Sequence, residues 1–339
     1  MEHLWERICV SITGLSTIDI PRKAGFWRPQ QMPAEGRIRI SAAIADFLVH
    51  LKAIGRAETT IGCYRQDLRR LERALKDMPV CRISDTMIDR AVVRLAHPHC
   101  SGTPLSAASV NRMKSAWRSF FSWCLLSDRI PNDPSRALGL AQVDPKRTVA
   151  LRLHETEAFL GTIHKSSDPL ALRDEALFAL YAFTGMRRGE ALALRVGDYD
   201  RSGRCLRVER AKGGRSRICV VPARLARVLD RYIRSLALNQ RQSASAPLFP
   251  GSPGDRGLSP RRAQVRFHHW RRLAGIRGSV TIRSFRVGFG TILHNAGLDS
   301  MLIARALGHA DCRVTERYVE MDQSTLCAIL DRAIAGRPA

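Results

Sequence analysis

Apolar residues recur at helical spacing in the first third of the chain. Ile44, Phe47 and Leu51 lie three or four residues apart, and Gly55 is placed to end the helix that begins near residue 40. The same spacing predicts further helices over residues 59–75, over 85–95, and from about 109 onward. Together these elements predict a small helical bundle.

The pattern changes after residue 153, where helices are mixed with one hairpin. Helices are predicted over 154–164, 170–183 and 189–194. The runs 205–208 and 217–221 are strand-like and flank Lys212-Gly213-Gly214, an arrangement typical of a β-hairpin with glycine in its turn. The remainder is mostly helical, with a polar interruption over 243–260 and a last helix over 322–335. The expected fold is therefore mainly α with a small β-sheet.

Prolines and glycines mark the expected domain limits. Residues 1–37 show little periodicity and contain several prolines among basic residues, so we expect a poorly ordered basic extension. A helical domain is expected over 38–130. Residues 131–152 contain Pro131, Pro134 and Pro145 beside basic side chains and are expected to form a linker. The second domain is expected over 153–339, with the last helix at its end.

The charge of the chain points to a polyanionic partner. Among its 339 residues, 55 are Lys or Arg and 31 are Asp or Glu, a formal net charge of +24. Solubility requires a net charge of only about 2–8 on a small domain, so nucleic acid is the expected partner. No apolar run reaches the length of a membrane span, and the first residues lack a secretory signal pattern. We therefore expect a cytoplasmic protein associated with the nucleoid and no membrane contact.

The nine cysteines do not suggest a metal or disulfide framework. Their number is odd, and no two stand in a Cys-x-x-Cys pair. Most are expected to be reduced, buried side chains. No metal site and no cofactor are expected.

Basic side chains in the helical domain are candidates for contacts with duplex DNA. They cluster on the polar side of the predicted second and fourth helices, although each one alone is also compatible with a solvated surface. The candidates are Arg65, Arg69, Arg70, Arg73, Arg112, Lys114 and Arg118.

In the second domain, arginines suited to a phosphate group occur at two places. Arg187 follows Thr184-Gly185-Met186 at the start of a predicted helix, and Glu190 could hold its guanidinium in place. Arg283 and Arg286 lie one helical turn apart, so they share a face and repel unless an anion lies between them. Each group alone has an ordinary structural explanation.

Three other side chains could take part in proton transfer or nucleophilic attack. Lys212 on the hairpin turn could reach a DNA groove or protonate a leaving oxygen. His309 follows Leu307-Gly308, and Tyr318 follows Thr315-Glu316-Arg317. Taken singly, these three are a solvated lysine, a loop histidine and a half-buried aromatic residue.

The order and spacing of these groups resemble the tyrosine recombinase (phage integrase) family. The resemblance covers roughly residues 40–335 and rests on five motif elements in sequence, which carry Arg187, Lys212, Arg286, His309 and Tyr318. It implies a SAM-like helical core-binding domain and an α+β catalytic domain that form a C-shaped clamp on duplex DNA.

The same resemblance implies a role for each residue. Tyr318 would attack the scissile phosphate and form a 3′-phosphotyrosyl link without metal or ATP. Arg187 and Arg286 would stabilise the phosphate charge, with Glu190 orienting Arg187. Lys212 would protonate the 5′ oxygen and His309 would hydrogen-bond a phosphate oxygen. The last helix would dock on a neighbouring protomer in a homotetramer on two DNA sites, or, as the alternative, pack on its own domain.

One residue departs from the family pattern. Arg283 stands where the family usually has the histidine that helps deprotonate the tyrosine, and an arginine cannot do so because its pKa lies above about 12. We expect Arg283 to add charge stabilisation while His309 or water takes the proton. The nearby His268 and His269 are interpreted as a DNA-facing or capping pair rather than as the missing base.

Three functions are therefore compared. The first is a site-specific recombinase of a mobile element. The second is a type IB topoisomerase, which would relax supercoils without strand exchange. The third is a recombinase-derived DNA-binding protein disabled by Arg283.

Overall fold

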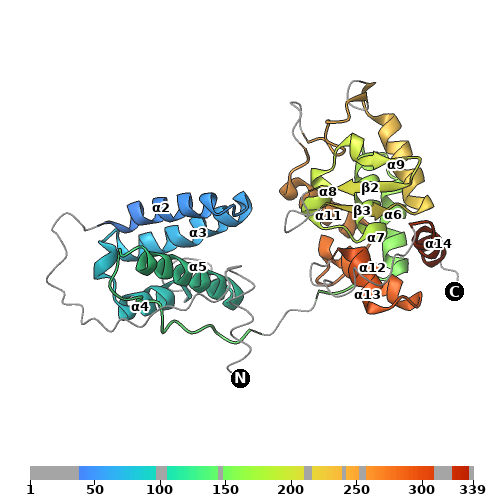
Figure 1. The fold of residues 1–339 in the computed structure, drawn as a ribbon. Helices are drawn as coiled ribbons and strands as arrows, with labels where there is room; N and C mark the ends of the chain where they lie inside the picture. Colours follow the sequence, from blue (N-terminus) through green and yellow to red (C-terminus); the bar gives the residue numbers. More distant parts are fainter. Residues whose placement is uncertain are drawn as a thin grey trace. The chain divides into compact units, whose positions relative to one another are not determined.

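The computed structural model forms two compact units, residues 1–145 and 146–339. It describes residues 38–96, 105–143, 148–209, 216–238, 242–251, 257–308 and 323–335 (Figure 1). The extension expected over 1–37 lies outside the described residues. None of the described helices combines the length and the apolar character needed to cross a membrane.

The first unit is a helical bundle, as the periodicity predicts. Its helices are α2 (Ile40–Ala53), α3 (Glu58–Leu75), α4 (Asp85–Ala96) and α5 (Ala107–Leu126), with a 3-10 turn, η2, at Val80–Arg82. Helix α2 ends just before Gly55, which has a φ of 71°. Ser106 caps α5, because its side chain accepts a hydrogen bond of 3.3 Å from the backbone N–H of Ser109.

The core of this unit extends beyond its last helix. Trp117 of α5 is fully buried, and its indole N–H donates to the backbone oxygen of Asp67 in α3 at 2.9 Å. Ile130 and Leu138 are buried in the same core. The Asn111 amide donates to the backbone oxygen of Ala141 and accepts from its N–H, at 2.7 and 2.9 Å. The first part of the segment expected as a linker, 131–152, is therefore packed on the bundle.

The second unit combines helices with a small antiparallel sheet in the order β1-β2-β3. Its strands are β1 (Tyr199–Asp200), β2 (Cys205–Val208) and β3 (Arg217–Val220). The sequence predicts β2 and β3 but not β1, which has only two residues. The helical elements are α6 (Leu153–His164), α7 (Ala171–Thr184), α8 (Arg188–Ala193), η4 (Val196–Asp198), α9 (Ala223–Ser235), α11 (Pro260–Leu273), α12 (Ile282–Asn295), α13 (Ser300–Leu307) and α14 (Gln323–Ile334).

Helix α7 is the centre of the second unit. It packs against α6, α9 and α12, and its last eleven residues are all buried. A helix that is apolar on all sides needs neighbours on all sides. Its buried carboxylate, Asp174, accepts hydrogen bonds from Arg173, Arg266 and the indole of Trp270. This network fixes α11 against α7.

Helix α14 packs on its own domain. It contacts β3 and α12, and it buries Leu330 and Ile334. Asp331 accepts hydrogen bonds from the backbone N–H of Ala223 at 2.7 Å and from Arg204 at 3.2 Å. Of the two placements expected for the last helix, the chain alone thus adopts the one within its own domain.

A close backbone approach joins α12 to the chain before α6. The backbone N–H of Leu151, which is buried in the second core, donates to the carbonyl of Ser284 at 3.2 Å. A Cβ atom on Gly288 would lie 2.2 Å from the carbonyl oxygen of Leu151. A glycine is therefore required at this position.

This contact predicts opposite effects for two glycine-to-alanine variants. Gly288→Ala should destabilise the protein by about 1–3 kcal/mol, because the backbone must shift to admit the methyl group. Gly161→Ala in α6, where no atom lies within 4 Å of the added Cβ, should stabilise it by about 0.5–1 kcal/mol through helix propensity. Urea unfolding curves measure both, and equal stability of the two variants would contradict the packing described.

Candidate active site

The site begins at the end of α7, where a turn places Arg187. Gly185 has a φ of 59°, and a Cβ there would lie 2.6 Å from the side chains of Leu307 and Phe289. The Thr184 hydroxyl donates to the Leu180 carbonyl at 2.6 Å and accepts from the backbone N–H of Met186 at 3.2 Å. The turn is thus held from within, and Arg187 becomes the residue that precedes α8.

Glu190 holds both the backbone and the side chain of Arg187. One carboxylate oxygen accepts from the Arg187 backbone N–H at 3.0 Å, and the other accepts from its guanidinium at 2.8 Å. The Glu190 side chain is only 6% exposed. Burial alone would raise the pKa of Glu190, but the hydrogen bonds from Arg187 and the positive charge of Arg217 hold it below its usual range. Glu190 is therefore a carboxylate that orients the Arg187 guanidinium.

Arg286 comes from α12 and meets Arg187 at the end of α13. Its guanidinium donates to the carbonyls of Gly185 at 2.7 Å and Leu307 at 2.8 Å. Arg187 donates to the next carbonyl, that of Gly308, at 2.9 Å. The structure thus brings together Arg187 and Glu190, from the start of α8, and Arg286 from α12.

Sequence reasoning missed a third arginine at this place, Arg217 of β3. Its guanidinium donates to Glu190 at 2.7 Å and to the carbonyl of Ala306 at 3.2 Å. The strand alternation contained a signal for it. Arg217 pairs with buried Val208 and is two residues from buried Cys219, so it belongs to the inward face of the hairpin.

These arginines form a cluster whose positive charge exceeds the charge of its one carboxylate. Burial, together with the like charges of Arg187 and Arg217, lowers the pKa of Arg286 to about 10, and Glu190 offsets this only in part. A phosphate group bound beside these guanidiniums would relieve their repulsion. The geometry is therefore that of an anion-binding site.

The other predicted site residues are only partly placed. Arg283 is exposed on the first turn of α12 and has no hydrogen-bond or ion-pair partner among the residues described; its charge contributes to the lowered pKa of Arg286. Lys212, His309 and Tyr318 lie outside the described residues. Of the histidine pair, His268 lies 2.9 Å from the amide nitrogen of Gln264, and His269 is 4.0 Å from Asp168.

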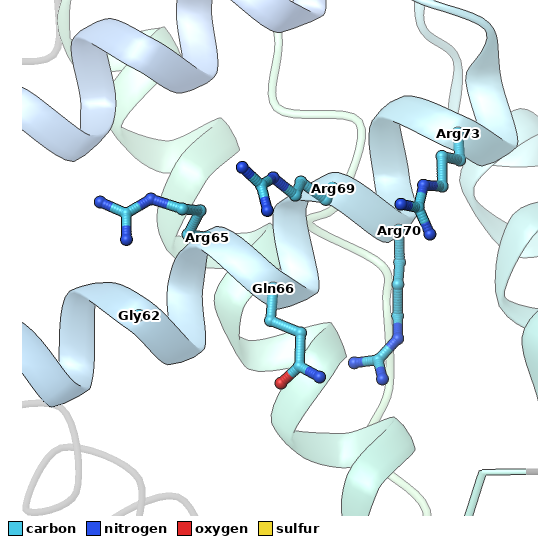
Figure 2. Close-up of a pocket in the computed structure, with 6 residues that line it drawn as sticks. All are labelled: Gly62, Arg65, Gln66, Arg69, Arg70 and Arg73. Carbon is cyan, nitrogen blue, oxygen red and sulfur yellow. The ribbon is translucent and has the colours of Figure 1, made fainter.

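In the first unit, basic side chains line a hollow along α3. Its volume is about 470 Å³, and Figure 2 shows Arg65 and Arg69 pointing to one side of the helix and Arg70 to another. Its lining residues are Gly62, Arg65, Gln66, Arg69, Arg70 and Arg73. Arg65, Arg69 and Arg73 are spaced four residues apart and so form one row along the helix.

Three of the seven residues predicted to contact DNA have partners within the protein. The buried carboxylate of Asp67 accepts from Arg70 at 2.5 Å and from Arg112 at 2.9 and 3.0 Å. Lys114 donates to the carbonyl of Gly139 at 2.7 Å. A buried carboxylate needs such cations. Arg112 thereby joins α5 to α3, whereas Arg70 pairs with Asp67 within α3. Arg65, Arg69, Arg73 and Arg118 have no such partner in the described part of the chain.

Two family profiles match the chain. The phage integrase family matches residues 150–325, and the N-terminal SAM-like domain of phage integrases matches residues 44–127. Tyrosine recombinase XerC of Chromobacterium violaceum is 29% identical over 291 residues, which cover 86% of this chain and 94% of that protein. Tyrosine recombinase XerC of Rhodospirillum centenum is 34% identical over 232 residues, covering 67% and 66%.

Solved structures share the fold. A lambda integrase tetramer bound to a Holliday junction aligns with a TM-score of 0.64 at 17% identity, covering 94% of this chain and 89% of that one. The XerH recombinase bound to its difH substrate aligns with a TM-score of 0.57 at 22% identity, covering 85% and 82%.

The first profile spans more than half of the chain and contains the arginine cluster, and the second covers the helical bundle. The chain therefore belongs to the phage integrase family, and it is a tyrosine-type site-specific recombinase, a DNA strand-exchange enzyme.

Proposed function

We propose that this recombinase cleaves duplex DNA with Tyr318 and rejoins it through a 3′-phosphotyrosyl intermediate, in the service of a mobile element. The observation that carries the proposal is the meeting of Arg187 and Arg286 at the end of α13, beside Glu190. Tyr318 follows this helix by eleven residues in the sequence. Because the substrate is DNA, we place the activity in the cytoplasm, at the nucleoid.

In the first step, the Tyr318 oxygen attacks phosphorus and the bond between phosphorus and the 5′ oxygen breaks. Negative charge builds on the non-bridging oxygens, where Arg187 and Arg286 supply donors that are already fixed. Their fixation costs no reorganisation during the reaction, because Glu190 and the carbonyls of residues 185, 307 and 308 hold them beforehand.

The protons move between three other residues and water. The 5′ oxygen leaves with a proton from Lys212, and the tyrosine proton passes to His309 or to water. Arg283 cannot accept this proton, but its charge adds to the field at the phosphate. In the second step, the 5′-hydroxyl of a partner strand attacks the phosphotyrosine and releases Tyr318. The bond energy is conserved in the intermediate, so the reaction consumes no ATP and needs no metal.

DNA binding and assembly complete the proposal. The first unit acts as the core-binding domain over 38–130, and the row Arg65, Arg69 and Arg73 contacts the DNA backbone. Exchange between two sites requires a homotetramer in which α14 contacts a neighbouring protomer. Because α14 contacts its own domain in the single chain, it must leave that surface before it can bind the neighbouring protomer.

The nucleophile is tested first. Tyr318→Phe should abolish the SDS-resistant protein–DNA adduct on nicked duplexes tiled across the DNA that flanks the gene, in EDTA, because the ring without its hydroxyl cannot attack phosphorus. The wild type and Tyr64→Phe, a tyrosine variant of α3 in the first unit, should form the adduct. If the wild type binds particular fragments without forming an adduct, the protein is a disabled DNA-binding protein instead.

The departure at Arg283 has its own test. Arg283→Gln should slow single-turnover cleavage about tenfold, less than the 10²–10³ that loss of a direct donor costs, because its exposed charge acts at a distance. Arg277→Gln, an exposed arginine just before α12, is the control and should cleave at the wild-type rate. Faster cleavage by Arg283→Gln would mean that Arg283 hinders the reaction.

The row on α3 is tested by salt dependence. Arg69→Ala and Arg73→Ala should each reduce the slope of log affinity against log salt by about 0.9, because each removes one phosphate contact. Fluorescence anisotropy with a duplex at several salt concentrations measures this slope. Arg90→Ala, an exposed arginine of α4, should leave the slope unchanged. Unchanged slopes for the α3 variants would place the DNA elsewhere.

A further inference from the structure

The end of α13 collects three guanidiniums in succession. Its carbonyls at Ala306, Leu307 and Gly308 accept hydrogen bonds from Arg217, Arg286 and Arg187, in that order. The last carbonyls of a helix lack partners within the helix and carry a partial negative charge. Three consecutive carbonyls therefore set the spacing of three cations.

Arg217 differs from the other two arginines in what it connects. Arg187 and Glu190 belong to one turn of chain, whereas Arg217 reaches Glu190 from β3. Its second bond, to Ala306, fixes the end of α13 to the same carboxylate. The Arg217 side chain is only 15% exposed, so it supports the other two arginines from within the protein and does not face solvent. Its Nε is buried without an acceptor among the residues described.

The backbone at the end of α13 leaves space for the Arg217 guanidinium. Gly308 ends α13 with a φ of 66°, and a Cβ on it would lie 2.7–2.8 Å from three atoms of the Arg217 guanidinium. Any other residue at 308 would push Arg217 off the helix end. The observed position of Arg217 therefore requires glycine at 308, in addition to the positive φ that favours glycine there.

We propose that Arg217 is a positioning residue of the strand-transfer reaction, acting through Glu190 and the end of α13 on Arg187 and Arg286. The inference rests on the proposed phosphate-binding role of those two arginines. A lysine cannot replace Arg217 fully, because one ammonium group lacks the planar fork that reaches a carboxylate and a carbonyl together. A displacement of about 1 Å in a positioned group can cost about 100-fold in rate.

The test separates binding from chemistry. Single-turnover cleavage of a nicked duplex is measured at saturating protein, together with DNA affinity and melting temperature. Arg217→Gln should cleave about 100-fold more slowly with DNA affinity within about twofold of the wild type, and Arg217→Lys should fall in between. Arg207→Gln, on the exposed face of the neighbouring strand β2, should cleave at the wild-type rate. A rate within about threefold of the wild type for Arg217→Gln overturns the inference.

A double-variant cycle tests the route of the effect. If Arg217 acts through Glu190, the pair Arg217→Gln and Glu190→Gln should be no slower than the slower single variant. Fully additive losses would mean that Arg217 acts independently, and this also overturns the inference. A wild type that forms no adduct contradicts the proposed function instead, so the two failures are distinguishable.

A second variant tests the same contact from the end of α13. Gly308→Ala keeps every side chain of the cluster and places a Cβ against the Arg217 guanidinium, at a backbone φ of 66° that also disfavours alanine. It should slow cleavage strongly in the wild-type background and much less when combined with Arg217→Ala, which removes the clash. Equal slowing in both backgrounds would show that the cost of Gly308→Ala comes from the backbone and not from Arg217.

Discussion

A buried carboxylate must be surrounded by cations or hydrogen-bond donors to remain charged, and this constraint organises both units. Asp67 joins α3 to α5 through Arg112, and Asp174 joins α7 to α11 through Arg266. Glu190 does the same between α8 and β3, where the arginines it gathers are those of the candidate active site. In a chain with an excess of 24 basic residues, each of these three buried acids holds two arginines in place.

The sequence predicts most of what depends on local spacing. The helices of the bundle, the hairpin strands β2 and β3, and the last helix all follow from periodicity, as does the Arg187–Glu190 contact between residues three apart. Contacts between distant residues leave no such signal. Arg217 and Glu190 are 27 positions apart, and Arg187 and Gly308 are 121 apart. Likewise, the residues around Arg112 in the sequence do not predict that its guanidinium will pair with the buried carboxylate of Asp67.

Close backbone approaches at three glycines allow the arginines of the candidate active site to converge. At Gly185 and Gly308 an added Cβ would lie under 3 Å from Leu307 or Arg217, and at Gly288 it would meet the carbonyl of Leu151. Two of these glycines lie within the turns that hold Arg187 and the end of α13. The guanidiniums can therefore converge only because the backbone has no side chain at these points.

The proposed exchange of α14 between protomers must compete with the docking of this helix on its own domain. The helix is held by Asp331 and by two buried apolar side chains, and fifteen residues separate its start from the end of α13. Because the helix and its docking surface belong to one chain, their effective concentration is high, on the order of millimolar for short connections. Copies free in dilute solution cannot compete with that value. Copies held side by side on one DNA, as in the proposed tetramer, reach comparable local concentrations, so the same contact can be intramolecular in the free chain and shared in that assembly.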